Sequence, residues 1–261
     1  MTVKVSAASY WIGYKTILIK EVTRILRIWA QTLIPPIITM SLYFIIFGTI
    51  IGRRVGEMDG IPYMDFIVPG LIMLSVITNA YGNITSSFFG AKFGRHIEEL
   101  LISPLPPWII LAGYVSGAVF RSLLVGALVL LVAGAFSGFH LHNLPVTLSV
   151  VVLTAVVFAL AGLINAIYAR KFDDISIIPT FVLQPMTYLG GVFFSVSLLP
   201  GITQTLSLAN PILYMVNAFR YGMLGISDVS LWVAYAIIIG FGAVLLTISL
   251  LLLSRGVGLR S

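Results

Sequence analysis

Long stretches without charged residues dominate the chain and predict membrane-spanning helices. A helix needs about 20 mostly apolar residues to cross the hydrocarbon core of a bilayer, which is about 30 Å thick. Gly138, Asn143 and Pro145 form a turn signal that divides the longest of these stretches. Six spans are then predicted, at residues 28–52, 66–91, 100–120 with its continuation past Arg121, the part of 122–169 beyond the turn, 175–194 and 229–254. The predicted fold class is an all-α polytopic membrane protein.

The composition agrees with this pattern and excludes several kinds of chemistry. The mean hydropathy is +1.07 and 9% of the residues are charged, whereas roughly a quarter are charged in soluble domains. The chain has no cysteine, which excludes disulfides, thiolate metal sites and cysteine nucleophiles. It also has no Gly-x-x-x-x-Gly-Lys-Ser/Thr loop, so it does not itself cradle the phosphates of ATP.

The positions of Lys and Arg explain the net charge of +6 as membrane topology and not as nucleic-acid binding. Basic residues accumulate in the cytoplasmic loops of membrane proteins. With the N-terminus inside, Arg53, Arg54 and Arg220 lie outside, and the inner segments hold Lys4, Lys15, Lys20, Arg24, Arg27, Lys92, Arg95, Arg170, Lys171, Arg255 and Arg260. Both termini are therefore predicted to be cytoplasmic.

Residues 1–29 show an amphipathic pattern ahead of the first span. One predicted helical face holds Tyr14, Leu18, Val22, Ile25 and Trp29, and another holds Lys20, Arg24, Arg27 and Gln31. This pattern favours a helix that lies at the cytoplasmic interface, where basic side chains meet anionic lipid headgroups. The alternative is that the segment is the cytoplasmic end of one long first helix.

Residues 92–103 are too charged and too short to cross a membrane, since twelve helical residues extend about 18 Å. Phe93, Ile97, Leu100 and Leu101 would share one helical face, and Arg95 would pair with Glu98 or Glu99 on the other. Proline cannot continue a helix, so Pro104, Pro106 and Pro107 would brace the segment against the next span. The pattern indicates a short rigid cytoplasmic helix, and a solvated loop with one helical turn is the alternative.

Residues 196–218 are too apolar for a free loop and too interrupted for a span. Pro200, Gly201 and Pro211 break the segment, and Gly222 follows it. A pair of short re-entrant helices fits both facts, because irregular backbone is tolerated at membrane depth where protein buries it. An interfacial hairpin fits the residues equally well.

Arg121 is the one charged residue predicted well inside a span. Gly113, Gly117 and Arg121 follow each other at intervals of four and share one helical stripe. Small residues at this spacing permit close helix packing, so the stripe should face protein or a hydrated path. Arg121 would either attract an anionic group of a substrate along a translocation path or hold helices together, and the residues leave both roles open.

Other ionisable residues argue against two further classes of protein. All nine acidic residues map to loops or span ends, whereas ion-coupled transporters usually place acids near the bilayer midplane. His140 and His142 have no carboxylate near them in sequence, which favours a surface turn over a metal site. No cluster of nucleophiles, bases or metal ligands indicates an intramembrane enzyme.

Several longer motifs resemble those of the ABC-2 type permeases, also called type V exporters, and cover essentially the whole chain. They are "PGLIMLSVITNAYGN", "SSFFGAKF", "IEELL", "ISPLPP", "FDDIS", "TYLGGVFFS" and "NPILYMVNAFRYG". Within this family the chain is most similar to the YadH-type inner-membrane permeases. The resemblance implies one transmembrane domain over residues 1–261 in the bacterial inner membrane, which forms a homodimer.

The resemblance also implies roles for particular residues and partners. Two copies of a separate ATPase subunit would bind ATP and Mg²⁺, and this chain would hold no cofactor or metal and bind no nucleic acid. Residues 92–103 would couple the ATPase to the spans, with Gly94, Arg95, Glu98, Glu99 and Leu100 as contact residues. Pro211, Tyr214 and Arg220 would belong to an outer gate. The expected function is ATP-driven export of an amphipathic or lipid-linked substrate, and the alternative is an ion-coupled secondary transporter.

Overall fold

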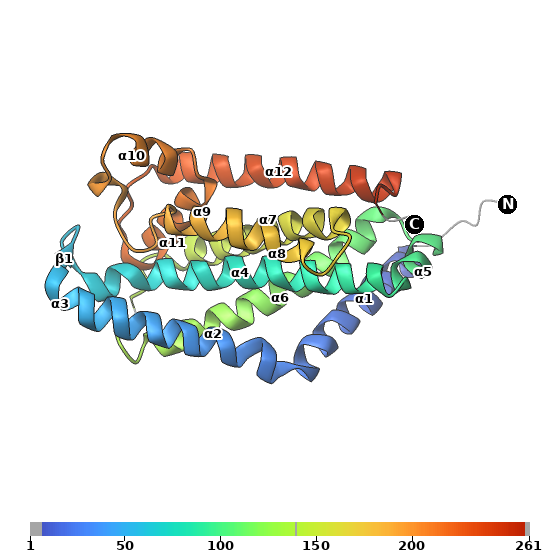
Figure 1. Ribbon diagram of the computed structural model, residues 1–261, viewed down its shortest axis with the longest axis horizontal. Coiled ribbons are helices and arrows are strands. Elements are labelled where there is room, and N and C mark those ends of the chain that lie inside the picture. Colours follow the sequence, from blue (N-terminus) through green and yellow to red (C-terminus); the bar gives the residue numbers. More distant parts are fainter. Residues whose placement is uncertain (1–6, 139, 259–261) are drawn as a thin grey trace.

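The computed structural model describes residues 7–138 and 140–258 and consists mainly of long helices that run side by side (Figure 1). Helix α1 (Ala7–Arg27) meets α2 (Trp29–Tyr43) at a sharp bend, and α2 continues through the π-helix η1 (Phe44–Ile51) into α3 (Gly52–Val55). The two-residue strands β1 (Glu57–Met58) and β2 (Ile61–Pro62) pair antiparallel at the far tip. Residues 7–27 therefore form a helix that is bent away from the first span, and its place at the membrane interface stays a prediction.

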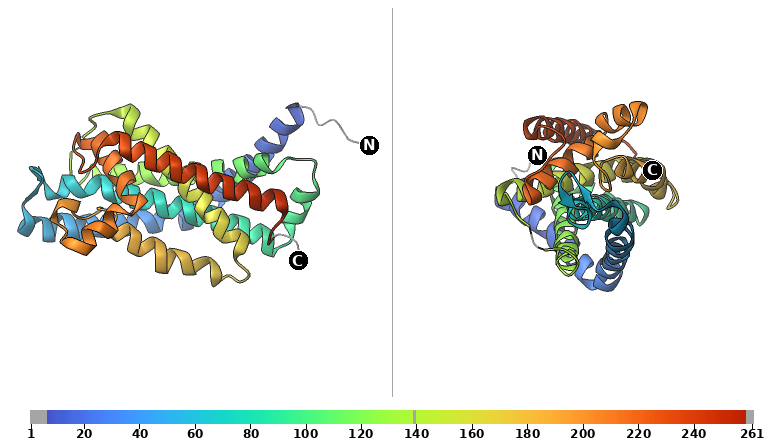
Figure 2. Two further views of the ribbon diagram at one scale, coloured as in Figure 1. Left: turned by 90° about the horizontal axis from the view of Figure 1, so that it is seen from above. Right: turned by 90° about the vertical axis from the view of Figure 1, so that its left-hand side faces the viewer.

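Helix α4 (Tyr63–Phe93) forms the centre of the bundle. It packs against α6 (Pro107–Ala133) and α7 (Leu144–Tyr168), and most of its side chains are buried. Gly162 allows α7 to approach α4 closely, since a Cβ there would lie 2.6 Å from the carbonyl oxygen of Tyr81. Helix α12 (Leu231–Arg255) lies on the outside of the bundle (Figure 2).

Five helices in the described residues are long and apolar enough to cross a membrane, which confirms the all-α polytopic fold. They are Trp29–Val55, Tyr63–Phe93, Pro107–Ala133, Leu144–Tyr168 and Leu231–Arg255. The predicted turn is also confirmed, because Asn143 caps α7 by accepting a hydrogen bond from the Val146 N–H over 3.2 Å.

The predicted span 175–194 is shorter than expected. Its helix runs through α8 (Asp174–Ile178), the π-helix η2 (Pro179–Leu183) and α9 (Gln184–Tyr188), about 22 Å in all. Asp174 accepts the backbone N–H groups of Arg170 and Lys171 where this helix begins, and these bonds lower the pKa of its carboxyl. The helix ends before Gly190 and Gly191, and Gly191 has a φ of +72° that favours glycine.

The irregular segment after α9 leads into three short helices at the end of the bundle that carries β1 (Figure 1). These are the 3₁₀-helix η3 (Val196–Leu198), α10 (Gly201–Leu208) and α11 (Pro211–Leu224). Helix α11 is mostly buried, whereas α10 exposes Ile202 and Leu206. Helices α10 and α11 lie where the pair of short helices was predicted, although α11 continues past residue 218 to Leu224, and their depth in the membrane stays a prediction.

The opposite end of the bundle holds α5 (His96–Ile102), the start of α1 and the end of α12 (Figure 1). This places the charged segment after α4 beside the two ends of the described chain. Of the basic residues counted for this side, Lys4 and Arg260 lie outside the described residues.

Candidate functional site

The exposed surface of α4 is a narrow stripe of small and polar residues. Thr78, Gly82, Ser86 and Gly90 are exposed at intervals of four, while their neighbours between Phe66 and Ala91 are buried. A Cβ on Gly82 or Gly90 would meet no atom of the described chain within 4 Å, so the stripe faces open space. We call these four residues the α4 stripe. The periodicity of small residues in the sequence is the signal that would have identified it.

A cleft of about 610 Å³ lies at the α5 end of the α4 stripe. Ser86, Ser87 and Gly90 contribute its α4 wall, and Lys20 and Arg24 contribute part of its α1 wall. Its third wall comes from α5, with His96, Glu99 and Leu100. We call it the α1–α4–α5 cleft.

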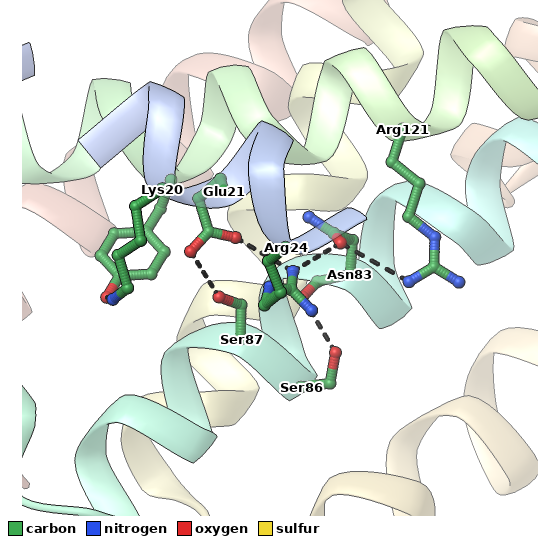
Figure 3. A network of polar contacts seen from close by, with 8 residues as sticks. Lys20, Glu21, Arg24, Asn83, Ser86, Ser87 and Arg121 are labelled. Atoms are coloured by element: carbon green, nitrogen blue, oxygen red, sulfur yellow. Dashed lines mark hydrogen bonds and ion pairs between the residues drawn. The ribbon is translucent and has the colours of Figure 1, made fainter. Parts of the chain in front are cut away.

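A buried polar cluster connects α1 to α4 beside this cleft (Figure 3). The Glu21 carboxylate is fully buried, accepts a 2.6 Å hydrogen bond from the Ser87 hydroxyl, and forms an ion pair with Arg24 over 3.0 Å. Arg24 also donates to Asn83 Oδ1 over 2.7 Å. The cluster fixes one face of α1 onto the centre of the bundle.

The burial of Glu21 corrects two predictions. This acid lies inside the helical bundle and not at an exposed loop or span end. The buried face of α1 is also rotated from the predicted one, because Ile17 and Glu21 are buried together with Ile25, whereas Tyr14, Leu18 and Val22 are only half-buried. The reason is that α1 packs along α6. A charged side chain such as Glu21 can be buried in this contact because it is paired with Arg24 and accepts a hydrogen bond from Ser87.

The stripe that holds Arg121 faces protein, as predicted, and the facing element is α1. A Cβ on Gly113 would lie 2.6 Å from Ile17 Cγ2, and one on Gly117 would lie 2.5 Å from Glu21 Cβ. Arg121 Nη1 donates to Asn83 Oδ1 over 3.5 Å, which joins Arg121 to the buried cluster (Figure 3). A pathway role for Arg121 remains a prediction.

The segment 92–103 forms a shorter helix than predicted. Helix α4 continues to Phe93, and the chain then turns through Gly94 and Arg95, whose φ of +60° is left-handed. Helix α5 buries Ile97 and half-buries Leu100, whereas the predicted apolar partner Phe93 is exposed on α4. The proline brace agrees with the prediction, since Pro106 has extended backbone and Pro107 begins α6.

The charges of this segment are arranged differently from the prediction. Arg95 forms no ion pair with Glu98 or Glu99 in the described part of the chain, because it occupies the turn and precedes the helix. Lys92 instead donates to the carbonyl oxygens of Ile167 and Ala169 over 2.6 and 2.7 Å. A cation at the end of α7 satisfies carbonyl groups that lack helical partners. Glu98 and Glu99 are left exposed on α5.

The three residues assigned to an outer gate lie along α11 and do not converge on one point. Pro211 begins α11, and the Tyr214 hydroxyl donates to the carbonyl oxygen of Leu208 over 2.7 Å. Arg220 is almost fully buried, donates to Gly191 O and to Asn217 Oδ1, and lies 4.0 Å from the centre of the Phe66 ring. These contacts join α10, α11 and the irregular segment after α9.

His140 and His142 line a pocket of about 490 Å³ that also contains Asp65. The fold thus brings a carboxylate near the two histidines that are remote from it in sequence. No group of three or more potential metal ligands forms within residues 7–138 and 140–258.

Residues 13–224 match the family model described as ABC-2 type transporter. The chain belongs to the ABC-2 type transporter family. It is 56% identical over 252 residues to the inner membrane transport permease YadH of Escherichia coli (strain K12). The aligned region covers 97% of this chain and 98% of that protein.

More distant similarity supports the same family assignment. This ABC-2 permease is 32% identical over 185 residues to nodulation protein J of Sinorhizobium fredii (strain NBRC 101917 / NGR234), which covers 70% of each chain. The permease is a multi-pass inner-membrane protein and a transport component that is not itself the ATPase. Family membership implies partnership with an ABC ATPase.

Proposed function

We propose that this permease forms a homodimer whose two α4 stripes line a path for ATP-driven export of an amphipathic or lipid-linked substrate. The observation that carries the proposal is the α4 stripe itself. A helix surface that faces lipid is usually apolar, whereas this one presents two hydroxyl groups, from Thr78 and Ser86, and two glycines. Small and polar residues suit a path that holds the polar groups of a substrate. A second copy would supply the opposite wall.

The proposed direction of coupling follows from the two ends of the bundle. The end with α5 is proposed to face the cytoplasm, because the predicted inner segments hold most of the basic residues. Two ATPase subunits would dock there, one on each α5. ATP and Mg²⁺ would be bound by those subunits.

The α4 stripe can be tested by filling the open space next to it. Gly82→Leu should leave folding intact, since a Cβ there meets no described atom within 4 Å. It should lower transport by about tenfold, equivalent to about 1.4 kcal/mol, because a bulky apolar side chain obstructs the path. Transport is measured as ATP-dependent movement of substrate in vesicles that contain the permease and its ATPase.

Gly240→Leu is the matched control, because Gly240 on α12 also faces open space. It should leave transport unchanged. Equal transport by Gly82→Leu and Gly240→Leu would show that the α4 stripe does not line the path. Transport that continues without ATP but follows an ion gradient would favour the ion-coupled alternative.

A second prediction concerns α5 and the ATPase. Cysteines at Glu98 and Glu99, which are exposed, should crosslink to the ATPase in the intact complex, whereas a cysteine at the buried Ile97 should not. Glu98→Lys should preserve membrane insertion and reduce the stimulation of ATP hydrolysis. If neither glutamate position crosslinks, α5 is not the docking helix.

A third prediction separates the two roles of Arg121. Arg121→Gln keeps a hydrogen-bond donor near Asn83 but removes the charge. If Arg121 attracts an anionic substrate, transport should fall by about tenfold, or about 1.4 kcal/mol, while assembly with the ATPase remains intact. Loss of assembly in a pull-down assay would instead establish the structural role.

A further inference from the structure

We propose that the α1–α4–α5 cleft binds the phosphate headgroup of an anionic membrane lipid. The cleft shares Ser86 and Gly90 with the α4 stripe, but its test measures retained lipid and not transport, so this proposal can fail while the proposed path stands. The proposal rests on the shape of the cleft, an excess of hydrogen-bond donors beside it, and the apolar surface around it.

The cleft has the size and position of a headgroup site. Its volume of about 610 Å³ lies within the range of small-molecule pockets, about 300 to 1,000 Å³. It opens where α4 approaches its end at Phe93, which is also where the apolar helix gives way to the charged α5. A basic pocket between helices at the end of a span is a common way to hold anionic headgroups.

Positive charge exceeds negative charge around the cleft. Lys20 and Arg24 line it and Arg121 lies behind Asn83, whereas the carboxylates are Glu21, paired with Arg24, and Glu99 on the α5 wall. The Lys20 ammonium lies 3.5 Å from the Tyr114 hydroxyl and 5.5 Å from the centre of its ring, forms no ion pair within the described residues, and belongs to an exposed residue. It is therefore available to a ligand.

The polar cluster beside the cleft also has more donors than acceptors. Within the described chain, buried N–H groups of Arg24 Nε, Asn83 Nδ2 and Arg121 Nε have no hydrogen-bond partner. The Glu21 carboxylate, in contrast, has both oxygens occupied by Ser87 and Arg24. Asn83 and Arg121 lie behind the wall of the cleft and do not line it, so these donors act through the positive potential that they add to that of Lys20 and Arg24, which favours an anion in the cleft.

The surroundings favour an amphiphile over a free anion. Helix α1 exposes Ile12, Ile19 and Leu26 by 63%, 51% and 52%, and Phe93 at the end of α4 is 62% exposed. A basic cleft with apolar side chains on its flanks can hold a headgroup and its acyl chains together. Because Glu99 and Leu100 of α5 line the same cleft, the bound lipid would contact the proposed ATPase-docking helix directly.

The test measures lipids retained by the full permease in complex with its ATPase, by native mass spectrometry. The probes are dioleoyl phosphatidylglycerol, which is anionic, and dioleoyl phosphatidylcholine, which is zwitterionic. The wild type should retain phosphatidylglycerol preferentially. Lys20→Gln should lower its retention by about fivefold, which corresponds to about 1 kcal/mol for one basic residue near an anionic lipid.

Two further variants complete the test: one should increase lipid retention, and the other is a control that should leave it unchanged. Glu99→Gln removes the carboxylate from the α5 wall and should raise the retention of phosphatidylglycerol. Arg54→Gln removes an exposed cation at the opposite end of the bundle and should change nothing. Equal retention of the two lipids, or equal losses in Lys20→Gln and Arg54→Gln, would overturn the proposal. Displacement of phosphatidylglycerol by inorganic phosphate would show that the cleft binds a water-soluble phosphate and not a lipid, and this would contradict the proposal.

Discussion

Replacing Arg24 with Met should lower the free energy of unfolding by about 3 kcal/mol, because it leaves the buried Glu21 carboxylate without its cation. The remaining Ser87 hydroxyl donates one hydrogen bond and carries no charge. The effect would be measured by denaturant titration of the purified permease in detergent micelles. Arg27→Met is the matched control, since Arg27 is exposed on the same helix and should change stability little.

A double variant shows whether the ion pair itself causes the loss. Glu21→Gln combined with Arg24→Met removes the charge that Arg24 neutralises and retains a side chain that can accept from Ser87. Most of the stability should return, since replacing both members of a buried pair is far less costly than removing one. A double variant as unstable as Arg24→Met alone would show that Arg24 contributes through packing and not through Glu21.

Hydropathy alone predicted most of the fold, because a segment that crosses lipid must be apolar and must form its backbone hydrogen bonds within itself, as a helix does. This requirement located the long helices and the turn ahead of α7. It overestimated the length of the predicted span 175–194, where apolar residues continue past the end of the helix at Tyr188. The adjacent Gly190 and Gly191 were the missed signal, because Gly191 adopts a positive φ that ends the helix.

The polar contacts of the candidate site were harder to predict. Glu21 stands among Lys20, Arg24 and Arg27, so its sequence neighbours indicate a solvated helix. Contacts with Ser87 of α4 and Gly117 of α6, both remote in sequence, bury it. The spacing of Gly113 and Gly117 did predict a close helix contact, but no sequence pattern identifies α1 as the helix in contact.

Arg220 holds the irregular segment after α9 to α11, and Arg220→Lys should loosen this contact. A lysine is shorter and donates from one point, so it cannot reach Gly191 O and Asn217 Oδ1 together. We expect a loss of about 2 kcal/mol in the free energy of unfolding, the typical contribution of a hydrogen bond to a charged group. The irregular segment between α9 and η3 should become mobile first, because Gly191 belongs to it.

Thiol accessibility reports this loosening directly. Val192 is fully buried and its backbone lies against Gly70 of α4, so Val192→Cys alone should resist a membrane-impermeant thiol reagent in intact cells. In the Arg220→Lys background the same cysteine should react at least about tenfold faster, since a loss of about 2 kcal/mol in local stability raises the open population by more than that factor. Arg54→Lys with Val192→Cys is the control, because Arg54 is exposed and the guanidinium that donates to Gly191 is that of Arg220, so the cysteine should stay protected. A cysteine that stays protected in Arg220→Lys would show that the segment stays in place without the arginine, and that the packing of Val192 against Gly70 is enough to hold it.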